Sequence, residues 1–235
     1  MALFFKWIEY FSPDGTQNLK SFQSSDVCHN YTRNDATSVR CDWYDVVSDG
    51  KKYVYAAVTR DSSKLDVFDI DSGDMIGALD TCDNPRDLEY HSLRDEVWVR
   101  CSKGSMEPGE EGHMDVINAN GLFTDSFSNF TVSDGEGNAY GYTVVDATLG
   151  DVGYVSERYQ SHLMKLDLNK RTLIDKFPMD PLNSGIYEMA YSKVNRHIFA
   201  RSMVCCTCGF VGADKGEDCG RYGGDNVTVL IGPNA

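Results

Sequence analysis

The chain has 235 residues, of which 41% are hydrophobic and 25% charged, and 36 acidic against 22 basic residues give it a net charge of −14. This length suits one large domain with a substantial core, and no apolar run approaches the roughly 20 residues of a membrane-spanning helix. The acidic balance argues against nucleic acid as a partner, because phosphate binding requires clustered lysine and arginine.

Short runs rich in β-branched and aromatic residues recur along the chain, separated by turns of Gly, Asp, Asn and Ser. The runs form units of four strands in a constant order, and equivalent strands return after about 45 to 55 residues, the spacing of propeller blades. We therefore predict an all-β fold, a β-propeller of about four four-stranded antiparallel blades. A β-sandwich is the alternative, but its strands would not repeat in fours.

In chain order, the N-terminal stretch supplies two strands, three full units follow, and the last unit lacks its fourth strand. We treat residues 1–235 as a single propeller domain, with predicted blades at 1–27 (partial), 41–83, 85–129, 139–180 and 184–235 (incomplete). Open sheet edges template aggregation, so the unequal ends need an explanation. The ring is completed by a blade shared between the two ends, by a second copy in a homodimer, or by further sequence in a longer protein.

Eight cysteines and three Asn-x-Ser/Thr triplets indicate a secreted, oxidised glycoprotein. Strand alternation places the blade-to-blade links and the links between second and third strands on one face, and all the cysteines fall there. The cluster at 205–219 lacks paired Cys-x2-Cys knuckles, which favours disulfides over zinc. The order of the others allows Cys28 with Cys41 and Cys82 with Cys101. The predicted disulfide cysteines are Cys28, Cys41, Cys82, Cys101, Cys205, Cys206, Cys208 and Cys219, and the predicted glycosylation sites are Asn30, Asn129 and Asn226.

The sequence contains no phosphate loop, nucleophile elbow or Rossmann fingerprint, and its five histidines do not converge on the predicted fold, so we expect no enzyme. The alternative is a propeller hydrolase or lyase with a metal in its central channel. Its candidate ligands are acids that recur near equivalent first-strand positions: Asp45, Glu89, Asp146 and Glu188. Such acids also line water-filled channels without binding metal.

A third function is an acidic, calcium-associated matrix protein, which the sequence pI of about 4.6 suggests. Residues 69–74 alternate oxygen-bearing side chains around a glycine but lack the span and final Glu of a calcium loop, so they predict a β-turn. The acidic stretches 103–113 and 214–218 are expected to be solvated loops. Calcium is the only cofactor left open.

Two segments carry a resemblance to a known family: residues 53–104, with YVYAAV, KLDVFDI and DEVWV, and residues 153–206, with GYVSE, HLMKLDLNKR and HIFARSMVCC. They resemble the C-terminal propeller-like region of the follistatin-like proteins of the long type, follistatin-related proteins 4 and 5. A generic YVTN-type propeller is the runner-up. The resemblance implies a secreted glycoprotein whose propeller binds a protein or matrix component. It supplies no catalytic residues, and the family's upstream modules are not in this sequence.

Overall fold

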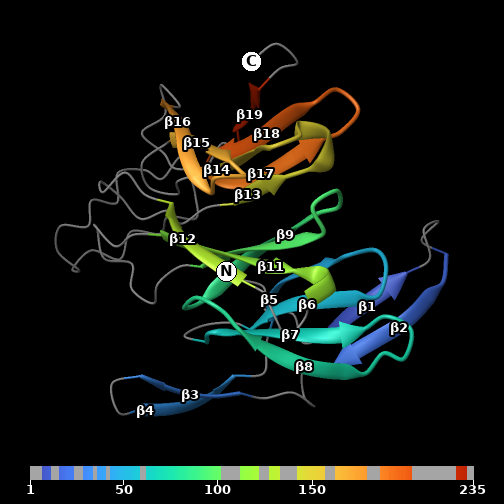
Figure 1. Ribbon diagram of the computed structural model, residues 1–235. Coiled ribbons are helices and arrows are strands. Elements are labelled where there is room, and N and C mark those ends of the chain that lie inside the picture. Colours follow the sequence, from blue (N-terminus) through green and yellow to red (C-terminus); the bar gives the residue numbers. More distant parts are fainter. Residues whose placement is uncertain are drawn as a thin grey trace.

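In its described residues, the computed structural model consists of β-strands joined by turns and two short 3-10 helices (Figure 1). Within its described part, no helix has the length and apolar character needed to cross a membrane. The described residues are 7–11, 16–23, 29–33, 36–40, 43–58, 62–101, 112–121, 127–132, 142–156, 162–178, 186–202 and 226–231.

Four antiparallel sheets follow one another along the chain, and we name them blades A to D. Blade A contains β5 (Trp43–Ser48), β6 (Tyr53–Val58), β7 (Lys64–Asp69) and β8 (Met75–Asp80). Blade B contains β9 (Pro85–His91), β10 (Glu96–Cys101), β11 (Gly112–Asn118) and β12 (Phe127–Val132). Blade C contains β13 (Thr143–Val145), β14 (Val152–Ser156), β15 (His162–Asp167) and β16 (Thr172–Pro178). Blade D contains β17 (Ile186–Ser192), β18 (His197–Ser202) and β19 (Asn226–Ile231).

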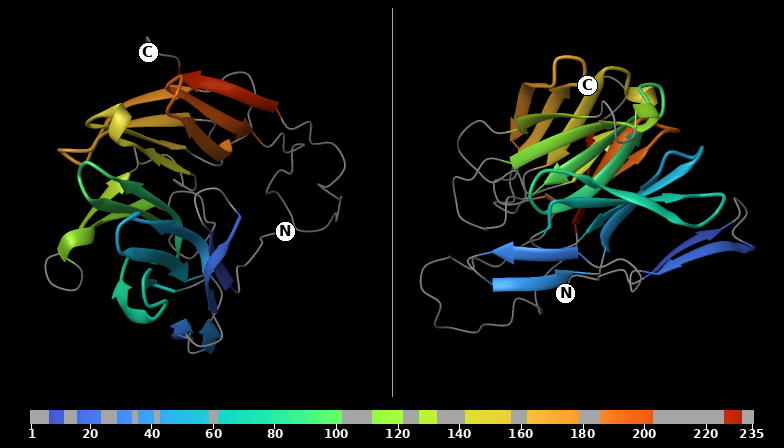
Figure 2. Two further views of the ribbon diagram at one scale, coloured as in Figure 1. Left: turned by 90° about the vertical axis from the view of Figure 1, so that its right-hand side faces the viewer. Right: turned by 60° about the horizontal axis from the view of Figure 1, so that its bottom comes forward.

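The strands of each blade pair in sequence order, and the first strands of successive blades lie side by side: β5 contacts β9, β9 contacts β13, and β13 contacts β17. The blades therefore fan out from a common inner edge, in the arc that Figure 2 shows. The 3-10 helices η2 (Ala119–Gly121) and η3 (Ala147–Leu149) lie between β11 and β12 and between β13 and β14. This arrangement is a β-propeller of four-stranded antiparallel blades, so the predicted fold class is confirmed.

The N-terminal part differs from the prediction at one place. The sequence suggested two strands before blade A, which correspond to β1 (Trp7–Phe11) and β2 (Asn18–Gln23), and then a blade-to-blade link. The structure instead contains a second hairpin in that link, β3 (His29–Arg33) with β4 (Ala36–Arg40). The residues between these strands are Asn and Asp, both common in turns, and this signal was overlooked because the runs are short and polar.

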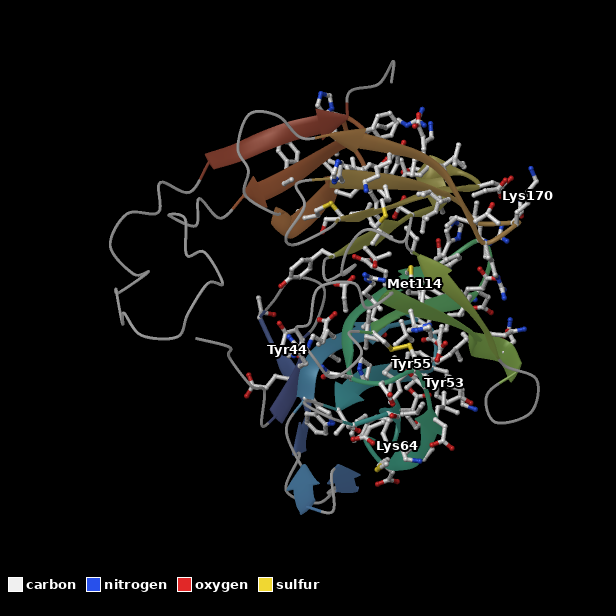
Figure 3. All side chains as sticks on the ribbon, turned by 90° about the vertical axis from the view of Figure 1, so that its left-hand side faces the viewer. Tyr44, Tyr53, Tyr55, Lys64, Met114 and Lys170 are labelled. Carbon is white, nitrogen blue, oxygen red and sulfur yellow. A yellow bond between two sulfur atoms is a disulfide. The ribbon has the colours of Figure 1, made fainter. Side chains whose placement is uncertain are left out.

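Consecutive blades pack face to face through apolar layers. Side chains alternate along a strand, so a strand between two blades buries both of its faces and reads as a continuous apolar run. In β10, Val97 and Val99 pack against Tyr55 of blade A, whereas Trp98 packs with Met164 of blade C. A third layer joins Tyr154 and Leu163 of blade C to Ile198 of blade D. Figure 3 shows the labelled Tyr55 and Met114 in this interior.

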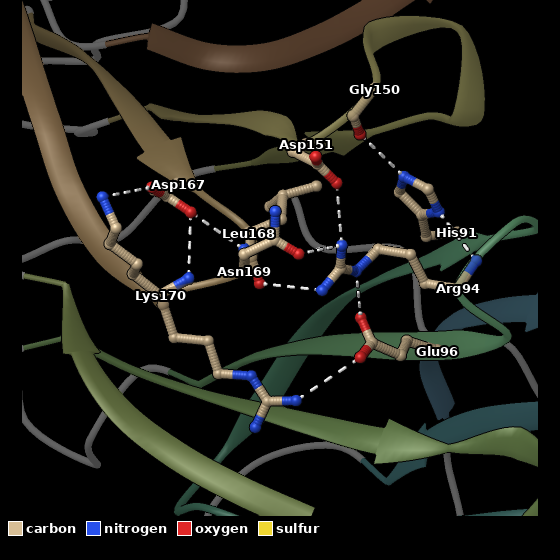
Figure 4. Close-up of polar contacts among 10 residues, drawn as sticks. His91, Arg94, Glu96, Gly150, Asp151, Asp167, Leu168, Asn169 and Lys170 are labelled. Carbon is tan, nitrogen blue, oxygen red and sulfur yellow. Dashed lines mark hydrogen bonds and ion pairs between the residues drawn. The ribbon is translucent and has the colours of Figure 1, made fainter.

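A polar clasp joins blades B and C at the turn between β9 and β10 (Figure 4). The Arg94 guanidinium donates to Glu96 at 2.9 Å in its own blade. It also reaches blade C, donating to Asp151 at 3.0 Å, to Asn169 at 2.7 Å and to the Leu168 carbonyl at 3.3 Å. The neighbouring His91 ring lies 3.2 Å from the Gly150 carbonyl oxygen. A single arginine therefore connects three segments of two blades.

Replacing Arg94 by Met should lower the free energy of unfolding by about 2 kcal/mol, because several charge-assisted hydrogen bonds of a side chain that is 20% exposed are lost. Urea denaturation followed by tryptophan fluorescence measures this change. The matched control is Lys170→Met, which removes an ion pair to Asp167 from a side chain that is 78% exposed. That control should stay within about 0.5 kcal/mol of the parent. Equal effects of the two substitutions would contradict the clasp.

Candidate functional site: buried carboxyl groups of the inner strands

Two aspartates on the first strands connect neighbouring blades through the backbone. Asp45 of β5 accepts a hydrogen bond from the Leu88 N–H of β9 at 2.7 Å, and Asp87 of β9 accepts one from the Thr143 N–H of β13 at 2.6 Å. The inner edge of each sheet has backbone groups with no neighbouring strand to pair them, and a buried N–H without a partner is costly. The carboxyl groups supply that partner, and the contact repeats from one blade to the next.

Of these two residues, the sequence interpretation named Asp45 and missed Asp87. Both stand two positions after the start of their strands, in Trp43-Tyr44-Asp45 and Pro85-Arg86-Asp87. An alignment of the blades on strand starts would have found the second aspartate. The sequence interpretation named Glu89, two residues further along β9, as the acid of this blade near the equivalent first-strand position.

The carboxyl groups of Asp45, Asp87, Glu89 and Asp146 are close enough to influence one another's ionisation. Burial is the main cause that raises the pKa of Asp45 and of Asp87, and the Asp45 charge raises that of Asp87 further. Burial, followed by the charges of Asp87, Asp45 and Asp146, raises the pKa of Glu89 to about 9. Glu89 is therefore mainly protonated at neutral pH.

Asp146 stays ionised at the edge of this cluster. Burial opposes its charge, but the Lys193 ammonium at 2.8 Å and hydrogen bonds from the Thr148 N–H and hydroxyl outweigh burial and lower its pKa. It also caps the 3-10 helix η3. The structure thus brings together three of the four predicted channel acids, Asp45, Glu89 and Asp146. The fourth, Glu188, lies in β17, and its side chain is outside the described part.

Among the described residues, no group of three or more His, Cys, Asp or Glu side chains is arranged to hold a metal ion. Asp45 and Asp87 each use one oxygen on a backbone N–H, and the Asp146 carboxylate is taken by Lys193 and Thr148. The chemistry that the cluster supports best is hydrogen bonding by buried carboxyl groups to backbone N–H groups, which ties the inner strands together.

A second pair of buried aspartates lies on the third strands, at positions that correspond in blades A and B. Asp66 of β7 accepts from the Trp43 indole N–H at 2.8 Å, and Asp115 of β11 accepts from the Cys82 N–H at 2.6 Å. Each aspartate holds the segment by which the chain enters its own blade. Sequence reasoning missed both, although the shared Asp-Val step in KLDVFD and GHMDVIN was a signal for them.

Cys82 and Cys101 form a disulfide with a Cα–Cα distance of 5.8 Å, one of the pairs that the sequence allowed. Cys82 lies in the link between blades A and B, and Cys101 ends β10. The bond is yellow in Figure 3, close to Tyr55.

The other six cysteines, Cys28, Cys41, Cys205, Cys206, Cys208 and Cys219, lie outside the described residues. Asn30, Asn129 and Asn226 lie in β3, β12 and β19, where the side chains are not described.

Residues 69–74, considered above as a calcium loop, form a turn. The Asp69 carboxylate accepts a hydrogen bond from the Ser72 N–H at 2.8 Å, and the Asp69 carbonyl accepts one from the Gly73 N–H at 2.9 Å. The Asp69 carboxylate is therefore used within the turn. Of the two acidic stretches, 214–218 lies outside the described residues, as does 103–113 except for Gly112 and His113.

Comparison with known proteins agrees with the propeller fold. No family model and no curated protein matches the chain. Among solved structures it is similar to Kuenenia stuttgartiensis hydrazine synthase, with 13% identity and a TM-score of 0.63 over 96% of this chain and 56% of that one. It is also similar to U3-55K (10% identity, TM-score 0.58, 83% and 52%) and to the RRP9 WD40 repeats (10%, 0.58, 83% and 51%).

These likenesses define the class of protein as a β-propeller, and at such low identity they carry the fold alone. The chain spans about half the length of the structures it matches. The resemblance to the follistatin-like family gains no support beyond the generic propeller.

Stability should fall as the pH rises through the range in which Glu89 ionises. Its folded pKa of about 9 exceeds the ordinary value of 4.5, so its contribution is complete below about pH 4.5 and is lost as the pH rises toward 9. Glu89→Gln should flatten the decline in unfolding free energy between pH 5 and 9, by up to about 1.4 kcal/mol per pH unit, and should exceed the parent in stability at pH 9.

Urea titrations at pH 5, 7 and 9 measure the effect of this substitution. The matched control is Asp74→Asn, which neutralises an exposed carboxylate in the β7–β8 turn and should leave the pH dependence as in the parent. A parent-like slope in Glu89→Gln would show that burial does not govern this carboxyl group.

Proposed function

We propose that this chain is an extracellular, non-enzymatic, protein-binding β-propeller module. The observation that carries the proposal is the asymmetry between its two faces. We call the face that carries the blade-to-blade links and the links between second and third strands the link face. Between second and third strands, the sequence has 10 residues from 102 to 111 and 23 from 203 to 225, whereas the turns opposite are as short as 92–95 and 193–196. The link face also contains the Cys82–Cys101 disulfide. A rigid blade stack whose longest connecting sequences join strands at one face is a suitable scaffold for binding, because connections tolerate variation while the strands hold their position.

The inner carboxyl groups support a non-enzymatic role in the same way. Asp45 and Asp87 bind backbone N–H groups of the next blade, which is a structural use of residues that an enzyme would direct at a substrate. The extracellular setting rests on the cysteine count and the three glycosylation triplets. The follistatin-like resemblance adds a class of partner, an extracellular protein or matrix component, and a second copy that completes the ring is the further partner we propose.

Expression in a eukaryotic secretory host, followed by peptide mass spectrometry, tests the setting. We expect glycans on Asn30, Asn129 or Asn226 and a Cys82–Cys101 cross-linked peptide. Eight free thiols with no glycan would overturn the extracellular part.

Binding is tested against a panel of purified extracellular proteins by biolayer interferometry, with residues 104–110 replaced by a Gly-Ser linker of equal length. This replacement should weaken binding at least about tenfold, whereas Leu93→Ser, on the opposite face, should not. The reverse pattern would place the interface on the other face.

The second candidate function is a propeller hydrolase or lyase, and the observation that favours it is the raised pKa of Glu89, a property of general acids. Elemental analysis of the purified protein distinguishes the candidates: we expect less than one bound transition metal per ten chains. The same sample titrated with calcium tests the acidic matrix protein. Stoichiometric metal that Glu89→Gln removes would favour the enzyme, and millimolar calcium binding would favour the matrix protein.

A further inference from the structure

The Cys82–Cys101 disulfide lies beside an imidazole and a buried carboxyl group. In the pairing of β10 with β11, His113 is directly opposite Cys101, and Asp115 is opposite Val99. Directly opposed residues, and residues two apart on one strand, place their side chains on the same face of a sheet. His113 and Asp115 therefore share the face of Cys101, which packs toward blade A. The sequence interpretation had left His113 isolated in a loop.

Asp115 connects this group to the other half of the disulfide. Its carboxylate is 1% exposed and accepts the Cys82 N–H at 2.6 Å. Burial raises its pKa, while the Cys82 N–H and the charge of His113 lower it, so the imidazole is near enough to act on the carboxyl group.

The two sulfur atoms differ in access and in their neighbours. Cys101 is 1% exposed, whereas Cys82 is half-buried in the link between the blades. The Thr81 hydroxyl lies 3.5 Å from the Cys101 sulfur and 3.7 Å from that of Cys82. An attacking thiol therefore reaches Cys82 first. The Thr81 hydroxyl lies near both sulfur atoms, whereas His113 is opposite Cys101, the residue whose sulfur leaves.

We propose that Cys82–Cys101 is a reducible site, at which a low-molecular-weight thiol such as glutathione opens the bond at Cys82, with His113 and Thr81 assisting the departure of Cys101. The incoming thiolate forms a bond to Cys82 Sγ, the Cys82–Cys101 bond breaks, and its electron pair leaves on Cys101 Sγ. The His113 imidazole N–H donates a hydrogen bond to the Cys101 thiolate as it leaves, and the thiolate then takes a proton from water. A second thiol then attacks the mixed disulfide, releasing the oxidised thiol. The net change is one protein disulfide and two thiols converted to two cysteine thiols and one oxidised disulfide.

Reduction would release the link between blades A and B, since the disulfide ties Thr81–Asn84 to the end of β10. The Thr81 N–H donates to the Ser63 carbonyl at 3.0 Å and the Asn84 N–H to the Ser62 carbonyl at 2.6 Å, so the backbone of blade A still holds both ends of this link. The expected consequence is local opening of the link face and not unfolding of the blades.

The test follows reduction of the full chain by glutathione at pH 7, with acid quenching, alkylation and peptide mass spectrometry. We expect the glutathione adduct on Cys82 and not on Cys101. We expect His113→Gln to slow opening at least about fivefold, because a leaving thiolate that is less stabilised departs more slowly. The matched control is His162→Gln, since His162 occupies the corresponding position in β15 of blade C and should leave the rate unchanged.

The direction of the change separates this role from a structural one, because a substitution that merely loosens the sheet would expose the disulfide and speed its reduction. Parent-like or faster opening in His113→Gln, or an adduct on Cys101, would overturn the proposal. The position of the adduct is measured in the unsubstituted protein, so the proposal can be refuted even where the variant folds poorly.

Discussion

The inner edges of the blades are the constraint on which this propeller depends. Each first strand is hydrogen-bonded on one side only, and its other edge faces the neighbouring blade without forming a ladder with it. Asp45 and Asp87 satisfy that edge by accepting the Leu88 and Thr143 N–H groups. The structure thereby places carboxyl groups where ionisation is costly: burial raises the pKa of both, and the Asp45 charge raises that of Asp87 further.

Four kinds of contact hold the blades together, and two of them are each confined to a single interface. Apolar layers fill the space between the sheets, the inner aspartates join the first strands, and the Arg94 clasp joins the turns of blades B and C. Between blades A and B, the Cys82–Cys101 disulfide adds a covalent tie on the link face. The link face therefore combines fixed anchor points with the longest connections, which is the property that the binding proposal uses.

The buried aspartates of the third strands give this repeat a second regularity. Asp66 and Asp115 each hold the chain where it enters a blade, one through an indole and the other through a backbone N–H. Blade C departs from both patterns: Tyr142 and Met164 stand where blades A and B have aspartates. In blade B, the third-strand aspartate lies beside the disulfide, so one residue serves both the blade entry and the environment of the sulfur atoms.

The sequence by itself determined the repeat, the antiparallel four-stranded units and the turn at 69–74, because alternation, spacing and turn chemistry are local properties of the chain. It also allowed the Cys82–Cys101 pair, since strand order places both residues on one face. It did not reveal that Asp87 repeats Asp45, that Glu89 is held mainly neutral, or that His113 faces Cys101. Those facts depend on register and on burial between blades. A shift of one residue in the pairing of β10 with β11 would move His113 to the opposite face, and only the packed structure decides which register forms.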